Sequence, residues 1–222
     1  MRTDSEGLTR RLKYIATIAV SNVDKKTVEG ETPVRLCNYT DVYYNEEISA
    51  ETPFMEATAT ADQIIRFSLR AGDVLITKDS ETPDDIAVPA FVPETLPGIV
   101  CGYHLAVIRA DQTKVFPKFL YWSMASAPTR QGLGAEATGV TRFGLRIDAI
   151  ANVRLRLPAL EEQRRIATFL DVETSRIDRI VRRLGGDAGS PAGSLCGLLL
   201  EKRHALITAG VIGELDLASA AA

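Results

Sequence analysis

The chain has 222 residues, of which 45% are hydrophobic and 25% are charged, and its formal net charge is −3. This composition is typical of a soluble globular protein, and no apolar run approaches the roughly 18 residues that a transmembrane helix needs. The three scattered cysteines, Cys37, Cys101 and Cys196, exclude a regular disulfide framework and favour reduced thiols in the cytoplasm.

Acidic and basic residues are distributed unevenly along the chain. Residues 1–108 hold 10 Lys/Arg against 17 Asp/Glu, whereas residues 109–222 hold 16 against 12. Such a balance is unlike a uniformly basic DNA-binding domain. Any attraction to phosphate must therefore come from a local surface, strengthened by assembly with partners.

The first polar cluster follows a short apolar run at 34–37. Its amide and phenol groups belong to Asn38, Tyr39, Tyr43 and Tyr44. Asparagine can pair with adenine, and tyrosine can contact bases or phosphates, so these four residues are candidates for DNA contacts. The alternative is an Asx-turn whose half-buried tyrosines have satisfied hydroxyls.

The next candidates lie where residues 74–77, a short apolar run typical of a buried strand, lead into a polar segment at 78–85 that predicts a surface loop. A side chain at this position has a rigid support and still points to solvent. Thr77 and Lys78 are therefore predicted to contact DNA, with the lysine reaching phosphate or guanine. The alternative for Lys78 is an ordinary solvated lysine.

The middle of the chain predicts further strands at 86–92 and 99–109, with a bulge at Gly102, and then a helix at 117–126. Cys101 and His104 have the spacing of a metal half-site, but no second pair accompanies them. We predict a buried thiol and a hydrogen-bonded histidine, with no metal and no cofactor.

Residues 132–144 contain four glycines and predict a loop or a pair of turns. Within it, Thr141 and Arg142 stand between Gly139 and Gly144. Glycines let the backbone approach a ligand closely, and a guanidinium suits phosphate oxygens, so both residues are candidate DNA contacts. The alternative is a tight turn in which Arg142 has no function.

A change of period marks the end of the first domain. Apolar residues alternate with arginines over 153–157, which predicts a strand, and Pro158 ends it. A helical stripe follows, and we predict that it packs lengthwise on a partner helix. Its members are Ile166, Leu170, Glu173, Ile177, Ile180 and Leu184. The charged member, Glu173, is predicted to pair with Lys202 or Arg203 and so to set the register.

Six arginines accompany this helix, and we predict a solvated face on which they pair with the acids of the same helix. Residues 184–193 then hold four glycines and one proline, which is too many for a continuous helix. The sequence therefore predicts two helices, near 160–184 and 194–213. It leaves open whether they fold back as a hairpin or continue in line.

Motifs for catalysis are missing from the sequence. It contains no G-x-x-x-x-G-K-[ST] phosphate loop, no G-x-G-x-x-G after a strand, and no Asp/Asn-Pro-Pro-aromatic tetrapeptide. His104 and His204 lie in different predicted domains without an evident nucleophile. These absences favour a protein that performs no chemistry itself.

The run LPALEEQRRIATFLD at 157–171, with Arg-Ile-Asp at 176–178 and LEKRHALI at 200–207, resembles the conserved helical region of specificity subunits of type I restriction–modification enzymes. Segments 34–44 and 72–79 are similar to parts of that family's target-recognition domains. The likeness runs from about residue 14 to residue 217. Family members usually carry two recognition domains, each followed by a conserved helix that continues unbroken, so this chain resembles a half-subunit.

The resemblance implies an α+β fold with a β-rich target-recognition domain at 1–158 and a coiled-coil helical arm at 159–222. It implies binding to double-stranded DNA, and partnership with methyltransferase (modification) subunits and a restriction/translocase subunit. A half-subunit would act as a homodimer or pair with another specificity chain. Two rival hypotheses are a free-standing DNA-binding regulator and a non-catalytic inhibitory partner that uses the acidic half of the chain.

Overall fold

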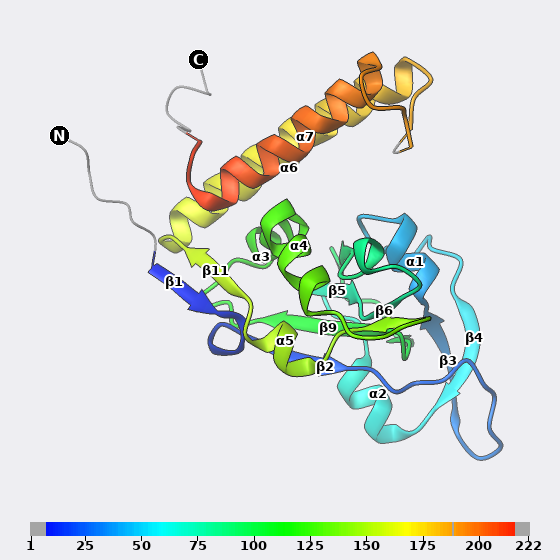
Figure 1. Cartoon of the computed structure of the whole chain (residues 1–222). Helices are drawn as coiled ribbons and strands as arrows, with labels where there is room; N and C mark the ends of the chain where they lie inside the picture. Colours follow the sequence, from blue (N-terminus) through cyan, green and yellow to red (C-terminus); the bar gives the residue numbers. More distant parts are fainter. Residues whose placement is uncertain (1–7, 188, 216–222) are drawn as a thin grey trace.

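The computed structural model describes residues 8–187 and 189–215 of the chain. Figure 1 shows a domain rich in β-strands, from which two long helices project as an arm. The strands are β1 (Leu8–Arg11), β2 (Ala16–Val20), β3 (Thr32–Cys37), β4 (Met55–Ala59), β5 (Asp73–Thr77), β6 (Asp79–Ser80), β7 (Pro89–Phe91), β8 (Ile99–Cys101), β9 (Leu105–Ala110), β10 (Phe143–Gly144) and β11 (Arg154–Leu157). The helices are α1 (Tyr39–Tyr44), α2 (Ala61–Phe67), α3 (Pro117–Ala125), α4 (Ala127–Glu136), α5 (Ile147–Ala151), α6 (Leu160–Arg183) and α7 (Leu195–Ile212), with short 3-10 turns at Leu12–Tyr14 and Pro83–Asp85.

An antiparallel sheet in the order β2-β9-β5-β7 lies at the centre of the domain. Its strand β5 is buried on both faces, which confirms the prediction for 74–77. Val74 and Ile76 point into a cluster shared with α3 and the arm, whereas Leu75 points toward a second sheet, β4-β3-β8. The expected strand at 86–92 is reduced to β7, whose three residues pair with residues 74–76 of β5, and Ala87 before it has a positive φ of 59°.

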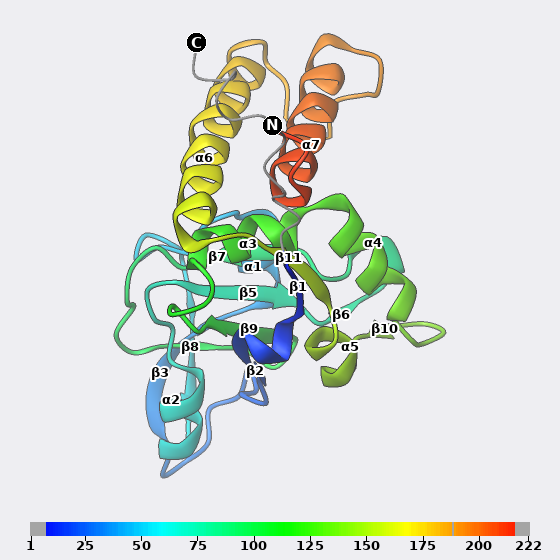
Figure 2. The ribbon, with the colours of Figure 1, turned by 90° about the vertical axis from the view of Figure 1, so that its left-hand side faces the viewer.

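The N-terminal strand β1 pairs with β11 in antiparallel register, so two segments far apart in sequence meet at the base of the arm (Figure 2). Along β11, Leu155 is buried and Arg154 is exposed, as the alternation predicts. Pro158 follows the last paired residue, and α6 begins two residues later at Leu160. The predicted change from strand to helix is confirmed.

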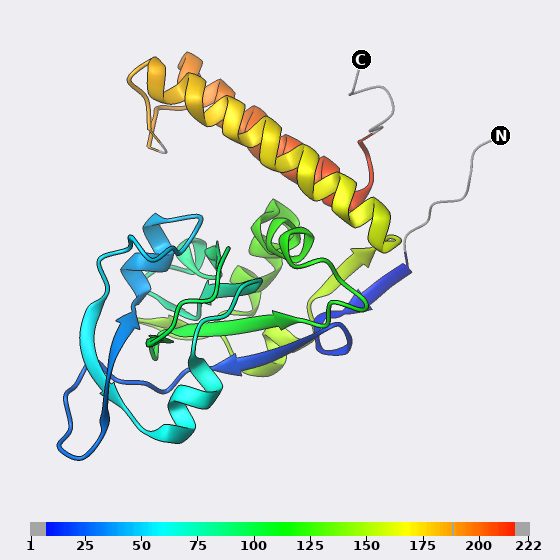
Figure 3. The same ribbon diagram turned by 180° about the vertical axis from the view of Figure 1, so that it is seen from behind.

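The two arm helices run antiparallel as a hairpin, side by side in Figures 1 and 3. Close approach sets their register: a Cβ placed on Gly210 would lie 3.2 Å from a methyl group of Leu170. Further along, Asp178 pairs with Arg203 at 2.9 Å. The glycine-rich loop between the helices reverses the chain. Of the two arrangements that the sequence leaves open, a hairpin or an in-line continuation, the structure has the hairpin. No helix in the described ranges is both long and apolar enough to span a membrane.

The buried stripe of α6 has the predicted period but a different membership. Ile166, Leu170 and Ile177 are buried, as predicted. The stripe then continues through Thr174 and Val181. The hydroxyl of Thr174 donates to the carbonyl of Leu170 at 2.6 Å, which lets a polar residue lie in this apolar seam.

Glu173 does not set the register of the hairpin. Its carboxylate lies 3.9 Å from Arg176 on the same helix, and Arg203 pairs with Asp178 instead. The prediction that Glu173 pairs with Lys202 or Arg203 is therefore wrong within this chain. The reason is the position of each residue around the helix. Asp178 lies on the side of α6 that faces α7 and the domain, whereas Glu173 lies on a different side.

Two further members of the predicted stripe lie outside the seam as well. Ile180 is 40% exposed and Leu184 is 50% exposed. Asp171 and Asp178 lie on the side of α6 that faces α3 and α7. Ile180 is two residues after Asp178, and two residues correspond to a rotation of about 200° around the helix. Ile180 therefore lies on the face of the arm turned away from the domain, and Leu184 follows it one turn later.

The four glycines at 132–144 predict a loop or a pair of turns, but this segment is not a continuous loop. Instead, α4 runs through Gly132 and Gly134. A Cβ on Gly134 would lie 3.0 Å from the carbonyl oxygen of Pro83, so this glycine permits close packing of the helix. Residues 102–104 also differ from expectation, because they form a turn between β8 and β9 rather than a bulge.

Candidate nucleic-acid interface

The predicted DNA-contacting segments gather at one end of the domain. The short helix α1 packs against β5 and β7. The chain then leaves β5 for β6, which pairs with β10 beside the loop at 138–144. In Figure 1 this is the right-hand end of the domain, below the loop that joins the arm helices. Segments predicted separately therefore lie on neighbouring elements.

Asn38 has a structural role at the start of α1. It is 8% exposed, and its backbone N–H donates to the Asp41 carboxylate at 2.7 Å. Its side-chain amide lies 3.5 Å from the carbonyl oxygen of Leu36. An asparagine before a helix with an acid three residues later is a common capping arrangement. The prediction that Asn38 reads a base is corrected, because the side chain is covered.

The tyrosines of α1 form a stacked pair and one exposed ring. The rings of Tyr39 and Tyr43 are 5.5 Å apart at an interplanar angle of 16°, and the Tyr43 hydroxyl donates to Asp85 at 2.9 Å. This hydrogen bond is the main cause that raises the pKa of Tyr43, so the phenol stays a neutral donor. Tyr44 is 76% exposed. A helix replaces the Asx-turn alternative, and Tyr44 is the most accessible of the three phenols.

Thr77 lies inside the domain and does not face solvent. It is fully buried, and its hydroxyl oxygen accepts the Val88 N–H at 2.9 Å and donates to the Asp85 carbonyl at 3.4 Å. Both contacts hold the segment that follows β6 against the end of β5. The predicted DNA contact at Thr77 is therefore wrong, because the last residue of this strand still belongs to the core.

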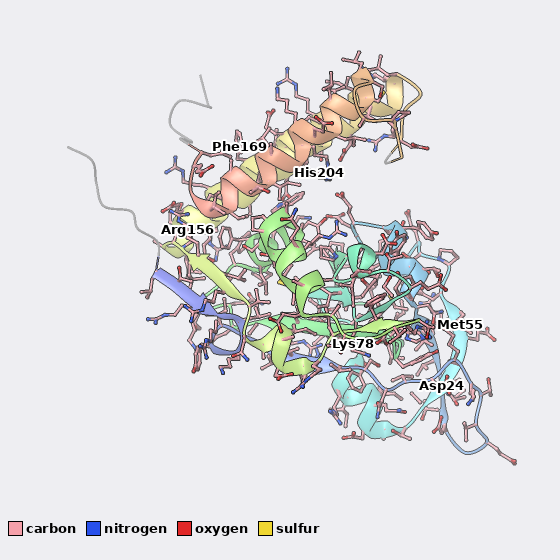
Figure 4. The ribbon with its side chains drawn as sticks, viewed as in Figure 1. Asp24, Met55, Lys78, Arg156, Phe169 and His204 are labelled. Carbon is pink, nitrogen blue, oxygen red and sulfur yellow. The ribbon has the colours of Figure 1, made fainter. Side chains whose placement is uncertain are left out.

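Lys78 belongs to a charged cluster with Asp79 and His104. The lysine Nζ lies 2.7 Å from one Asp79 oxygen, and His104 Nδ1 lies 2.9 Å from the same oxygen. A Cβ on Gly144 would lie 3.0 Å from the other Asp79 oxygen, so β10 covers this cluster. Figure 4 shows Lys78 within the domain, well apart from His204 on the arm. The Lys78 side chain is 18% exposed and paired with Asp79, so it is not the ordinary solvated lysine of the alternative.

The loop at 138–144 presents the most accessible polar groups of the predicted set. Thr138 and Gly144 close it with two backbone hydrogen bonds, of 3.1 and 2.9 Å. Between them, Thr141 and Arg142 are exposed. A closed loop of this kind holds its tip on a fixed support, so the hydroxyl and the guanidinium are available to a ligand.

Gly139 is the residue on which this loop depends, because its φ is +149° and an added Cβ would lie 1.9 Å from the carbonyl oxygen of Arg142. We expect Gly139→Ala to open the loop and to cost roughly 1–3 kcal/mol of unfolding free energy. The Gly144 amide, which donates to Thr138, should exchange with solvent faster in an NMR measurement.

Gly132→Ala is the matched control, because nothing lies within 4 Å of its added Cβ and it stands inside α4. This change should be neutral or stabilise the protein by up to about 1 kcal/mol. Equal stability of the two variants, with unchanged exchange at Gly144, would contradict the role given to Gly139.

Among the described residues, most arginines of α6 lack the acidic partners predicted for them on the same helix, and Arg176, 3.9 Å from Glu173, is the exception. Glu162 instead pairs with Arg156 of β11 at 3.0 Å, and Asp178 pairs with Arg203 of α7 at 2.9 Å. Several arginines therefore point to solvent with no ion pair to any described residue: Arg165, Arg179, Arg182 and Arg183. These four arginines give α6 exposed positive charge, in contrast to the acidic N-terminal half of the sequence.

Cys101 and His104 behave as predicted. Cys101 is fully buried, and burial raises the pKa of its thiol. His104 is 9% exposed and hydrogen-bonded to Asp79. Sequence reasoning missed Asp79 and Asp85, whose carboxylates organise this end of the domain. Two signals in the sequence could have identified them: Asp79 is next to the candidate Lys78, and Asp85 follows soon after the buried strand at 74–77.

We compared the chain with protein-family models, curated proteins and solved structures. No protein-family model matches the chain, and no curated protein matches it at a significant level. Solved structures do share the fold. The HsdS subunit from Thermoanaerobacter tengcongensis aligns with a TM-score of 0.59 and 24% identity, over 83% of this chain and 46% of that chain.

Two further structures align in the same way. The type I restriction–modification S subunit from M. genitalium has a TM-score of 0.50 and 15% identity, over 83% of this chain and 45% of its own. A chain from a study of complex assembly and conformational transition of the type I R-M system has a TM-score of 0.58 and 17% identity, over 97% of this chain and 48% of its own. This chain thus spans about half the length of each and has an α+β fold shared with them, as predicted.

Proposed function

We propose that this chain is a DNA-recognition half-subunit of a type I restriction–modification system, which directs partner methyltransferase and restriction subunits to a DNA half-site. The observation that carries this proposal is the structural match to S subunits over 83–97% of the chain but only 45–48% of those proteins. A match of this extent includes both the domain and the arm, which supports a recognition domain followed by its helical arm in this sequence.

The accessible groups at the end of the domain suit this task. Tyr44, Thr141 and Arg142 are exposed, and all stand on elements fixed to the central sheet. Hydroxyl, phenol and guanidinium groups on a rigid support can hydrogen-bond to base edges and phosphates. In this proposal the chain performs no chemistry and needs no cofactor of its own, and it acts in the cytoplasm, where the genome and the partner subunits are found.

The proposal is tested by co-expressing the chain with a type I methyltransferase (modification) subunit from the same genome and sequencing the methylated bases of the host DNA. We expect methylation at one defined motif, lost when the chain is omitted. Tight specific DNA binding without any methyltransferase would favour the free-standing regulator instead. Methylation that falls when the chain is added would favour the inhibitory partner.

Arg142→Ala should weaken binding of the assembled complex to its target by roughly 1–3 kcal/mol if the guanidinium contacts a base. If the guanidinium contacts a phosphate instead, the loss of affinity should be similar for all DNA sequences. The slope of log affinity against log salt concentration should then fall by about one. Fluorescence anisotropy at several salt concentrations measures both. The control is Arg66→Ala on α2, which removes an exposed arginine paired with Asp62 at 3.5 Å. Equal effects of the two changes would contradict a specific role for Arg142.

We also propose that the arm pairs with a second copy of the chain, or with another specificity chain, through the face turned away from the domain. Four large apolar side chains lie exposed near the tip of the hairpin: Ile180, Leu184, Leu195 and Leu198, at 40%, 50%, 62% and 52%. A group of large apolar side chains exposed on neighbouring elements normally marks a surface that binds a partner. A second chain would also supply the half that the longer S subunits contain.

A further inference from the structure

The segment that follows α1 is tied directly to the arm by a buried arginine. One guanidinium nitrogen of Arg203, on α7, donates to both Glu46 carboxylate oxygens at 2.5 and 2.6 Å. The Nε of the same guanidinium forms an ion pair of 2.9 Å with Asp178 of α6. Arg203 is only 6% exposed. A single side chain thus links both arm helices to the end of α1.

A second, parallel link starts from the next residue along the chain. Glu47 pairs with Lys118 of α3 at 2.6 Å, and Lys118 lies 3.7 Å from Asp171 of α6. The Asp171 carboxylate also accepts the indole N–H of Trp122 at 2.9 Å. We name the two links together, from Glu46 and Glu47 to α6, the arm clamp.

The spacing of the acids gives the arm clamp two points of attachment. Asp171 and Asp178 are seven residues apart, so they lie on one face of α6 about two turns from each other. Glu46 and Glu47 are adjacent and reach these two points through different cations. Two attachments along α6 fix the angle between the arm and the segment at residues 46–47, whereas a single attachment would let the arm rotate about it.

Next to the arm clamp, the arm and α1 are separated by a cleft of about 590 Å³. Tyr43 and Tyr44 line one side of this cleft, and Arg182 and His204 line the other. Packing at this end therefore does not hold α1 against the arm. The arm is held to the domain by α3, which packs against both arm helices, and the charged contacts that bridge the cleft add a second constraint on how α1 lies relative to α6 and α7.

We propose that Glu46 and Arg203 are positioning residues for DNA recognition, which hold the exposed tyrosine face of α1 at a fixed angle to the arm. This rests on the proposed function for its consequence in DNA binding, while the mechanical part stands by itself. With the arm clamp intact, two paired chains present their reading surfaces at one separation. With it open, each domain tilts and the match to a target of fixed spacing is lost.

The test uses Glu46→Gln in the full chain. The Glu46 side chain is 56% exposed, so we expect its neutralisation to leave the fold intact, which circular dichroism checks. Glu51→Gln is the matched control, since Glu51 is exposed on the same connection. Spin labels at Thr40→Cys on α1 and Ala192→Cys in the arm loop, with Cys196→Ser, report the distance between α1 and the arm. Cys37 and Cys101 are buried and stay unlabelled.

We expect Glu46→Gln to broaden the distance distribution and Glu51→Gln to leave it narrow. In the assembled complex, Glu46→Gln should lower target-specific affinity about tenfold, within the usual range of coupling between sites, with non-specific affinity unchanged. An unchanged distribution overturns the arm clamp. A broadened distribution with unchanged specificity overturns the positioning role.

Arg203→Met is the second variant, and it should show both effects more strongly because it also releases Asp178. If it unfolds, Glu46→Gln still decides the proposal. If the wild-type complex selects no DNA target, the proposed function fails, and the label distances still test the mechanical link.

Discussion

Replacing Ile180 and Leu198 together by glutamate is expected to convert a self-associated chain into a monomer without unfolding it. Both side chains are about half exposed, so the arm hairpin depends little on them. Full burial of such a side chain is worth about 1.5–3 kcal/mol, and burial of a carboxylate in its place is unfavourable. The dissociation constant should therefore rise by about 100-fold, since each 1.4 kcal/mol is a factor of about ten.

Analytical ultracentrifugation over a concentration series measures this change, and thermal unfolding checks that the fold is kept. The control is Ile65→Glu on α2, which is 68% exposed and lies away from the arm. Ile177→Glu provides the contrast, because Ile177 is 5% exposed in the seam and its replacement should destabilise the hairpin itself. A wild-type chain that stays monomeric at high micromolar concentration would contradict pairing with a second copy, and would leave pairing with another specificity chain as the form of the proposal to test.

Replacing Gln163 by alanine is expected to lower the free energy of unfolding by about 3 kcal/mol. Gln163 is fully buried at the start of α6. Its amide donates to the carbonyls of Pro158 at 2.8 Å and Lys114 at 3.1 Å, and its oxygen accepts the Phe116 N–H at 2.8 Å. Each buried partner left unsatisfied costs about 1–3 kcal/mol, partly relieved if water enters.

Urea unfolding followed by circular dichroism measures this loss. Gln131→Ala is the control, because Gln131 is exposed on α4 and its replacement should change stability by no more than about 0.5 kcal/mol. Similar midpoints for the two variants would show that the Gln163 hydrogen bonds contribute little. The expected difference would show what the two residues do at this junction: Pro158 ends the strand, and Gln163 holds the start of α6 to the segment that follows the strand.

The DNA-contacting predictions show where sequence reasoning stops. Arg142 and Thr141 are exposed as predicted, because flanking glycines close a tight loop at that point. Thr77 and Asn38 are buried, although each looked accessible at the edge of a polar segment. The position of a strand's last residue relative to the surface depends on what packs above it. For Thr77 this is the chain near Asp85, which no local pattern identifies.

The helical arm shows the same division. Its period followed from the spacing of Ile166, Leu170 and Ile177, but the later seam residues are Thr174 and Val181. A helix with several apolar and small residues has more than one possible face, and sequence cannot tell which face a partner will cover. Inside this chain the partners are α3 and α7, and they select the face that also brings Asp171 and Asp178 to the domain.

The sequence by itself determined the buried strand at 74–77, a stop at Pro158, and two helices broken by glycines. These follow from local rules of period, backbone geometry and hydrogen bonding, which act over a few residues. Only the tertiary structure decided that the helices form a hairpin, that Arg203 joins Glu46, and which candidate residues reach solvent. Those outcomes depend on contacts between segments up to 157 positions apart, where the energy of packing selects among arrangements that local rules leave equal.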